Sequence, residues 1–162
     1  MIQAQTGAAL ARLLEEEISI LTELSQLLER EHSIIATRQP VDVLDQACEL
    51  RQLRMGALLN LEEERRSLLR AANLPDTHQG IDQLLTNLSE GPRLRQRWKK
   101  ALELASRCRD LNDRNGALVA ARLRRVEGML EVMTGDVGSP RVYGPRGALT
   151  ADRNGRMLTA EA

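Results

Sequence analysis

One apolar stripe dominates the first 37 residues of this chain. Among the twelve positions that one helical face would present between residues 10 and 35, ten are Leu or Ile. The two exceptions are Glu17 and Glu31. A repeat of three and four residues is a helical pattern and excludes a strand. A helix over residues 4–37 is about 50 Å long, at a rise of about 1.5 Å per residue. In a chain of 162 residues, a helix of that length has to pack side by side with others.

Proline, glycine and asparagine residues divide the rest of the chain. Pro40 ends the first helix, because the residue before a proline is pushed out of the helical region, and it predicts a hairpin loop near residues 37–41. Asn73-Leu74-Pro75 and Gly91-Pro92 mark two further boundaries. We therefore predict helices over about 4–37, 42–72, 79–88 and 92–133, with Asp76 or Thr77 capping the short third one.

The predicted helix over residues 92–133 carries a seam that alternates spacings of four and three. Asn112 and Asn115 interrupt this seam, and Gly116 follows them. The two amides are either a device that fixes the pairing of helices or a contact for a partner. Gly116 costs about 1 kcal/mol in a helix, which predicts close approach of another helix. The seam runs through Leu94, Trp98, Ala101, Ala105, Cys108, Asn112, Asn115, Val119, Arg122, Val126, Met129 and Met133.

The last 29 residues differ from the rest. Residues 134–162 hold five of the eleven glycines, two of the five prolines and the only tyrosine, in the string Val-Tyr143-Gly-Pro-Arg-Gly. A segment so poor in apolar residues does not fold alone. The sequence therefore predicts an all-α protein: a bundle over residues 1–133, with three long helices in an antiparallel coiled-coil-like arrangement and one short connecting helix, followed by a flexible tail over residues 134–162.

The net charge of zero hides an uneven distribution. Residues 1–90 carry a net charge of −7, residues 91–133 carry +6, and the tail carries +1. An acidic helical hairpin packed beside a basic helix accounts for this division. The basic cluster at residues 93–100 is also compatible with a phosphate-binding patch, but zero overall charge and scarce aromatic residues argue against nucleic acid.

No catalytic constellation is evident. His32 and His78 lie in different segments without a neighbour at metal-ligand spacing, and the two Glu-Glu-Glu runs wrap around their helices. Cys48 and Cys108 read as reduced thiols of a cytosolic protein. No apolar run is long enough to span a membrane, and the N-terminus lacks the pattern of a secretory signal. We expect no enzyme activity, no cofactor, no metal and no small-molecule substrate.

The order of several short motifs resembles the FlgN family of bacterial flagellar export chaperones. The resemblance rests on the Trp98 segment, on Asn112-x-x-Asn115-Gly116, on Val-Tyr143-Gly-Pro-Arg-Gly147, on Glu31 and on Leu61-Glu62-x-x-Arg65. It implies an all-α cytoplasmic protein that binds the helical terminal region of the hook-associated proteins FlgK and FlgL. Such a chaperone would prevent their premature assembly and deliver them to the flagellar type III export gate.

The resemblance also implies partner-binding residues. Asn112, Asn115 and Gly116 match the motif of the long last helix, Val119 continues its seam, and Tyr143, Gly144 and Gly147 match the motif of the tail. The tyrosine-containing tail would contact the export machinery. Our working hypothesis makes the last helix and the tail the functional region and the first two long helices the scaffold. The same stripes also allow a homodimer, and a self-associating structural or regulatory coiled coil is the alternative.

Overall fold

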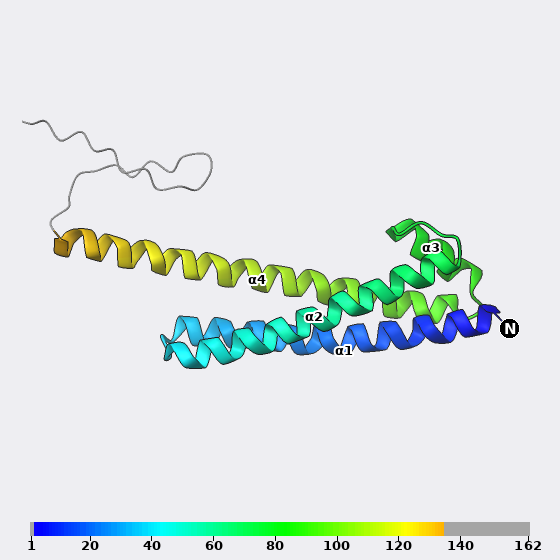
Figure 1. Ribbon diagram of the computed structural model, residues 1–162, viewed down its shortest axis with the longest axis horizontal. Coiled ribbons are helices and arrows are strands. Elements are labelled where there is room, and N and C mark those ends of the chain that lie inside the picture. The colour runs from blue at the N-terminus through cyan, green and yellow to red at the C-terminus, as the bar shows by residue number, and fades with distance from the viewer. Residues whose placement is uncertain (1, 135–162) are drawn as a thin grey trace, which may run out of the picture. The chain divides into compact units, whose positions relative to one another are not determined.

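Four helices make up the computed structural model, which describes residues 2–134 (Figure 1). They are α1 (Ile2–Ala36), α2 (Val41–Ala71), α3 (His78–Asn87) and α4 (Gly91–Thr134), and no strand occurs among these residues. The all-α class, with three long helices and a short one, is thereby confirmed. Each observed boundary lies within two residues of its predicted position.

The chain clusters into two compact units, Met1–Ala121 and Arg122–Ala162, and α4 contributes residues to both. The sequence did not indicate this division inside α4. The predicted boundary between a bundle and a tail at residues 133–134 stays a prediction, because residues 135–162 lie outside the described part of the chain.

Both long helices of the hairpin end in the same way. Arg38 and Asn73 follow α1 and α2 with φ angles of 55° and 56°, in the left-handed region. Beyond each of them the chain turns back, and the amides of Gln39 and Leu74 donate to the carbonyls of Ile34 and Leu69 at 3.1 and 2.9 Å. This pattern is the Schellman motif, which satisfies carbonyls that a helix end would otherwise leave unpaired.

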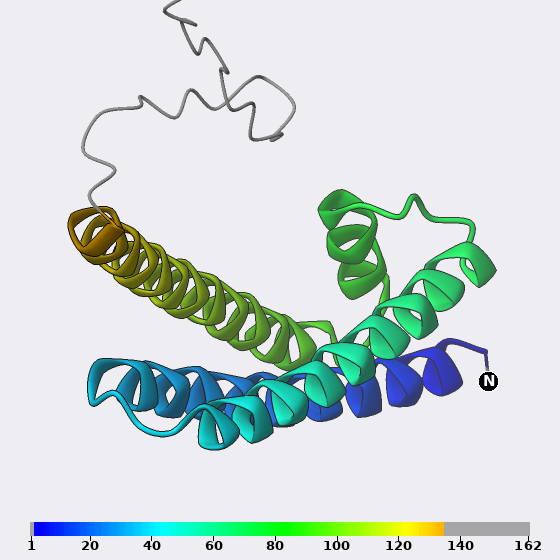
Figure 2. The same cartoon turned by 60° about the vertical axis from the view of Figure 1, so that its left-hand side comes forward.

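In the first unit, α2 runs antiparallel to α1, and the first part of α4 runs parallel to α1 (Figures 1 and 2). The ion pairs between α1 and α2 show the first relation. Glu17 pairs with Arg65 and Glu31 pairs with Arg51, so a step of two heptads forward in α1 is matched by two heptads backward in α2. Between α1 and α4, the contacts Leu21–Cys108 and Leu28–Asn115 both advance by one heptad. Steps of whole heptads are coiled-coil spacings.

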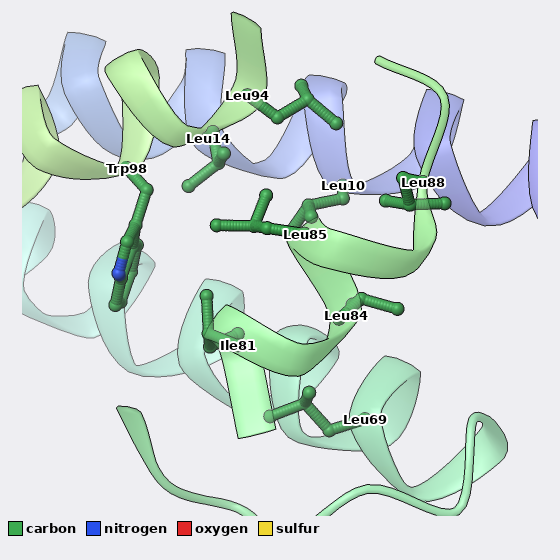
Figure 3. Close-up of a cluster of buried hydrophobic side chains, with 9 residues drawn as sticks. All are labelled: Leu10, Leu14, Leu69, Ile81, Leu84, Leu85, Leu88, Leu94 and Trp98. Atoms are coloured by element: carbon green, nitrogen blue, oxygen red, sulfur yellow. The ribbon is translucent and has the colours of Figure 1, made fainter. Parts of the chain in front are cut away.

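Two apolar clusters hold the first unit together. One cluster brings side chains from all four helices together, with Trp98 of α4 at one side and Leu88 at the opposite side (Figure 3). The other lies along α1, where Leu21, Leu24 and Leu28 contact α4. Each fully buried leucine contributes about 1.5–3 kcal/mol. The first cluster consists of Leu10, Leu14, Leu69, Ile81, Leu84, Leu85, Leu88, Leu94 and Trp98.

The short helix α3 is tightly fitted at both ends. The Thr77 side chain accepts a hydrogen bond from the Gly80 amide at 3.2 Å, which selects Thr77 from the two predicted capping residues. A Cβ atom at Gly80 would lie 1.9 Å from the carbonyl oxygen of Pro75, and one at Gly91 would lie 1.9 Å from that of Leu85. Only glycine permits these two approaches, so they fix α3 between α2 and α4.

Candidate partner-binding site

Two polar clamps join the helices of the first unit. In the first, both carboxylate oxygens of Glu17 accept from Arg65 at 2.8 Å. The guanidinium of Arg65 also lies over the Trp98 ring, 5.0 Å from its centroid. Because both charged side chains are largely buried and a cation–π contact adds to the pair, this clamp links α1, α2 and α4 beside the apolar cluster of Figure 3.

The second clamp, defined by Glu31, Arg51, Asn115, Asn112 and His32, lies where α4 has its last buried residue. Arg51 Nε forms an ion pair with the Glu31 carboxylate at 3.0 Å. The two atoms are not aligned for a hydrogen bond. Arg51 also donates to Asn112 at 3.1 Å. Asn115 donates to the carbonyl of Leu28 at 2.8 Å, and its amide oxygen is 3.0 Å from Nδ1 of His32.

Burial dominates the electrostatics of Glu31, whose exposed fraction is 3%. Desolvation raises the pKa of its carboxyl above the usual value of 4.5, while Arg51 and the Asn115 amide act in the opposite direction. The buried thiol of Cys108 is also affected: burial raises its pKa, and it donates to the carbonyl of Leu21 at 3.4 Å.

The predicted residues of α4 differ in their surroundings. Asn115 is 5% exposed and makes hydrogen bonds with Leu28 and His32, whereas Asn112 is exposed and accepts a hydrogen bond from Arg51. Val119 is 40% exposed. The close helix expected at Gly116 is not observed: a Cβ atom there would meet no atom within 4 Å, so this face of α4 is open.

The predicted seam of α4 is correct as far as Asn115, apart from a shift at residues 111 and 112. Leu94, Trp98, Ala101 and Cys108 are buried as expected, but Leu111 takes the buried position that the pattern assigned to Asn112. Leu111 is buried in place of Asn112 because an α-helix turns about 100° per residue and does not repeat after seven residues. Over a long contact, the buried row therefore drifts away from a strict heptad row.

Beyond Ala121, α4 carries an exposed apolar stripe. Leu123, Val126, Leu130 and Met133 are spaced by three, four and three residues, and each is more than half exposed. We call these four residues the α4 stripe. The predicted seam contained Arg122 and Met129 where the α4 stripe contains Leu123 and Leu130. None of the described residues of the second unit is buried. An apolar row with coiled-coil spacing that no described residue covers is the surface that an amphipathic helix of a partner would fit.

Tyr143, Gly144 and Gly147 lie outside the described residues. Within residues 2–134, no group of His, Cys, Asp and Glu side chains could hold a metal ion. In the same part of the chain, no helix has an apolar stretch long enough to cross a bilayer. The two described histidines contact an amide and a ring: His32 bonds Asn115, and His78 lies against Trp98.

Glu31 and Arg51 are site residues that reasoning from the sequence did not assign to a common cluster. Glu17 and Glu31 were the two polar exceptions in the stripe of α1, and Arg51 and Arg65 interrupt the corresponding stripe of α2. The structure pairs these exceptions with each other. Their equal separation of two heptads in both helices was the signal that could have revealed the pairs.

These features define an all-α protein built on a helical hairpin, with a third long helix whose apolar stripe is exposed among the described residues. Residues 1–151 match the family model described as "FlgN protein", and the chain belongs to the FlgN family. It is similar to the flagella synthesis proteins FlgN of Salmonella typhimurium and Salmonella typhi. Each is 26% identical over 136 residues, which cover 83% of this chain and 96% of the relative.

A crystal structure of a putative flagella synthesis protein FlgN from Pseudomonas aeruginosa has a similar fold. The TM-score is 0.63 at 28% sequence identity, over 68% of this chain and 85% of the other. The resemblance inferred from Trp98, the Asn112–Gly116 motif and the Tyr143 motif is thereby confirmed.

Proposed function

We propose that this chain is a cytoplasmic flagellar export chaperone. It binds the helical terminal region of the hook-associated proteins FlgK and FlgL, prevents their premature assembly and delivers them to the type III export gate. Membership of a family of flagella synthesis proteins supports the cellular process. The α4 stripe is the observation that supports helix binding, because four large apolar side chains at coiled-coil spacing are exposed on one helix.

The charges beside the α4 stripe favour one orientation of the cargo helix. On a helix of about 3.6 residues per turn, Arg122 and Arg125 lie along one edge of the stripe, and Glu127 and Glu131 lie along the other. A cargo helix with acidic residues toward the arginines and basic residues toward the glutamates would pair favourably in only one direction.

The remaining predicted residues are assigned by their surroundings. Asn112, Gly116 and Val119 are exposed on α4 within the first unit, and we propose them as partner-contact residues of that unit. Asn115 belongs to the same motif, and in our proposal it positions α4 through its bonds to Leu28 and His32. Tyr143, Gly144 and Gly147 are proposed to contact the export gate.

Co-expression with a hook-associated subunit tests the cargo site. The double variant Leu123→Glu, Leu130→Glu places charges in the α4 stripe and should abolish co-purification of the subunit. Val132→Glu is the matched control, because Val132 is 76% exposed on the same helix but lies off the stripe. A complex that survives the double variant would exclude the stripe as the cargo site. A homo-oligomer indifferent to such subunits would favour the self-associating alternative.

The tail is tested separately through Tyr143→Ala. We expect this variant to keep the cargo in a pull-down and to lose secretion of the hook-associated proteins. Equal loss of binding and secretion would instead make Tyr143 part of the cargo site.

A further inference from the structure

The side of α2 that is turned away from α1 (Figure 2) is apolar at its centre. Gly56 lies nine residues from both the buried Ala47 and Arg65, the partner of Glu17 in α1. Nine residues are about two and a half helical turns, so Gly56 is opposite the face that packs on α1. Leu53 and Leu59 flank it at three residues on either side and are 69% and 63% exposed. We call this side the outer face of α2, and it belongs to the first unit.

Gly56 has no packing role among the described residues. A Cβ atom at this position would meet no atom within 4 Å, and the backbone there does not adopt the left-handed conformation that favours glycine. A glycine inside a helix costs about 1 kcal/mol relative to alanine. What a missing side chain does permit is the close approach of another backbone. The outer face of α2 therefore combines an open glycine with two uncovered leucines.

The outer face of α2 reads alike in both directions from Gly56. At distances of three, four and seven residues, the matching pairs are Leu53 and Leu59, Gln52 and Asn60, and Glu49 and Glu63. All six side chains are exposed. A two-fold axis through Gly56 would pair α2 with an antiparallel α2 of a second copy and set each member of a pair against its counterpart. The leucines on either side of Gly56 would then lie opposite each other across the contact. A face with this symmetry is complementary to itself.

The charges toward the ends of α2 favour the antiparallel direction. The acidic side chains on the outer face that have no ion pair with a described residue are Asp42, Asp45 and Glu49. Asp42 lies fourteen residues before Gly56 and Arg70 lies fourteen residues after it, so antiparallel pairing brings Asp42 to Arg70 of the second copy. Glu49 would oppose Glu63, whose charge Arg70 offsets at 2.8 Å. A parallel pairing would instead set the three unpaired carboxylates against their own copies, which is unfavourable.

We infer that the outer face of α2 is a docking surface for the same face of a second copy of this chain, antiparallel, with the two-fold axis at Gly56. The contact extends over at most about 42 Å of one helix from each copy. It is therefore a small interface, and the dimer is reversible, with a dissociation constant of about 1–100 μM. The contact uses no residue of the α4 stripe and is independent of the function proposed for that stripe.

Cysteine cross-linking tests the direction and register of this pairing. Two full-length chains are prepared, one with Leu53→Cys and one with Leu59→Cys, and both carry Cys48→Ser because Cys108 is already buried. When the two are mixed and oxidised, they should form a disulfide-linked heterodimer, since facing positions bring Cα atoms to about 6 Å. Each chain alone should lose this cross-link, because copies of one position are about 9 Å apart along the helices.

Sedimentation equilibrium tests the strength of the dimer. The full chain with Leu123→Glu and Leu130→Glu is used, so that self-association cannot come from the α4 stripe. Gly56→Gln places a side chain at the centre of the contact and should raise the dissociation constant by at least about tenfold. Its melting temperature in dilute solution should not fall, because the position is open in the folded chain. Gly128→Gln, at another open glycine, is the matched control and should leave the dissociation constant unchanged.

Three results would overturn the inference. They are a chain that remains monomeric up to about 200 μM, a dimer that Gly56→Gln does not weaken, and disulfides that form within each cysteine variant alone but not in their mixture. Self-association that the Leu123→Glu, Leu130→Glu variant abolishes would belong to the α4 stripe and would also overturn it. Since the cargo test measures co-purification of a hook-associated subunit and these tests measure self-association, failure of either proposal leaves the other standing.

Discussion

Charged side chains inside the helical interface have an energetic cost that their neighbours only partly offset. Glu31 is almost fully buried, and Arg51 is the one cation paired with it among the described residues. An ion pair of this kind is weak evidence for stability, because desolvation of both charges opposes their attraction. Its better-attested role is to select one register, since a slipped pairing of α1 with α2 would leave Glu31 and Arg51 buried without partners.

The raised pKa of Glu31 predicts a specific dependence of stability on pH. The folded state holds the proton of this carboxyl to higher pH than the unfolded state does. Its contribution to stability is therefore fully present below the usual value of 4.5 and is lost as pH rises through the raised folded pKa. Relative to Glu31→Gln, the wild type should lose unfolding free energy as pH rises above 4.5 in a series of urea titrations.

Glu29→Gln is the control for this comparison, because Glu29 is an exposed carboxylate on the same helix. The loss of unfolding free energy above pH 4.5 should persist in Glu29→Gln, because Glu31 is unchanged in that variant. A difference between wild type and Glu31→Gln that stays constant with pH would show that the buried carboxyl does not titrate differently in the folded state.

Substitution of Asn115 tests which of two roles this residue has. It either fixes the register of the helices or contacts a partner. Asn115→Ala removes the donor to Leu28 and the partner of His32 inside the interface, so it should cost about 1–3 kcal/mol of unfolding free energy. Asn112→Ala, at an exposed position, should cost less than about 1 kcal/mol. If denaturant titrations give small and equal losses of unfolding free energy for the two variants, Asn115 has no structural role.

At the scale of the helices, periodicity decides most of what the sequence can reveal. The stripe of α1 predicted the buried row that includes Leu10, Leu14 and Leu28, because a helix packed on one side repeats about every 3.6 residues. The same reasoning chose Asn112 over Leu111 and placed Arg122 in the seam. A contact that drifts around a helix, and a helix that continues past its last buried residue, are determined by tertiary packing that periodicity does not contain.

The candidate site was predictable to a smaller extent. The polar breaks at Asn112, Asn115 and Gly116 were visible in the sequence, but their surroundings were not. Burial separates Asn115 from Asn112 although both interrupt the same pattern. A groove between α1 and α2 that Ala9 and Ala71 help to line was not predictable either, since small residues form a depression only where two helices diverge.

Gly116 gives a prediction that distinguishes stability from binding. Its position is open in the folded chain, so Gly116→Ala should stabilise α4 by about 1 kcal/mol and raise the melting temperature. If the cargo helix approaches closely at this position, the same substitution should weaken co-purification of the hook-associated subunit. Gly128→Ala is the control, because Gly128 is also open but lies on the face of α4 opposite the stripe. Unchanged cargo binding in Gly116→Ala would remove Gly116 from the contact.

At the scale of the whole molecule, the two apolar clusters and both clamps lie within residues 1–121. The last residues of α4 that contribute to them are Leu111 and Asn115. A chain that ends at Ala121 should therefore keep its melting temperature within about 3 °C of the full chain, because no described buried group is removed. It should lose the helical circular dichroism signal of residues 122–134 and, with the α4 stripe, the ability to retain a hook-associated subunit.

A chain that ends at Asp110 is the matched control for this truncation. It lacks Leu111, Asn112 and Asn115, so it loses one buried leucine and both α4 amides of the second clamp. The loss of the leucine alone should cost about 2–5 kcal/mol, and the melting temperature should fall well below that of the chain ending at Ala121. Similar melting temperatures for the two truncated chains would show that the second clamp contributes little. A large fall already at Ala121 would mean that residues 122–162 contribute to the stability of the first unit.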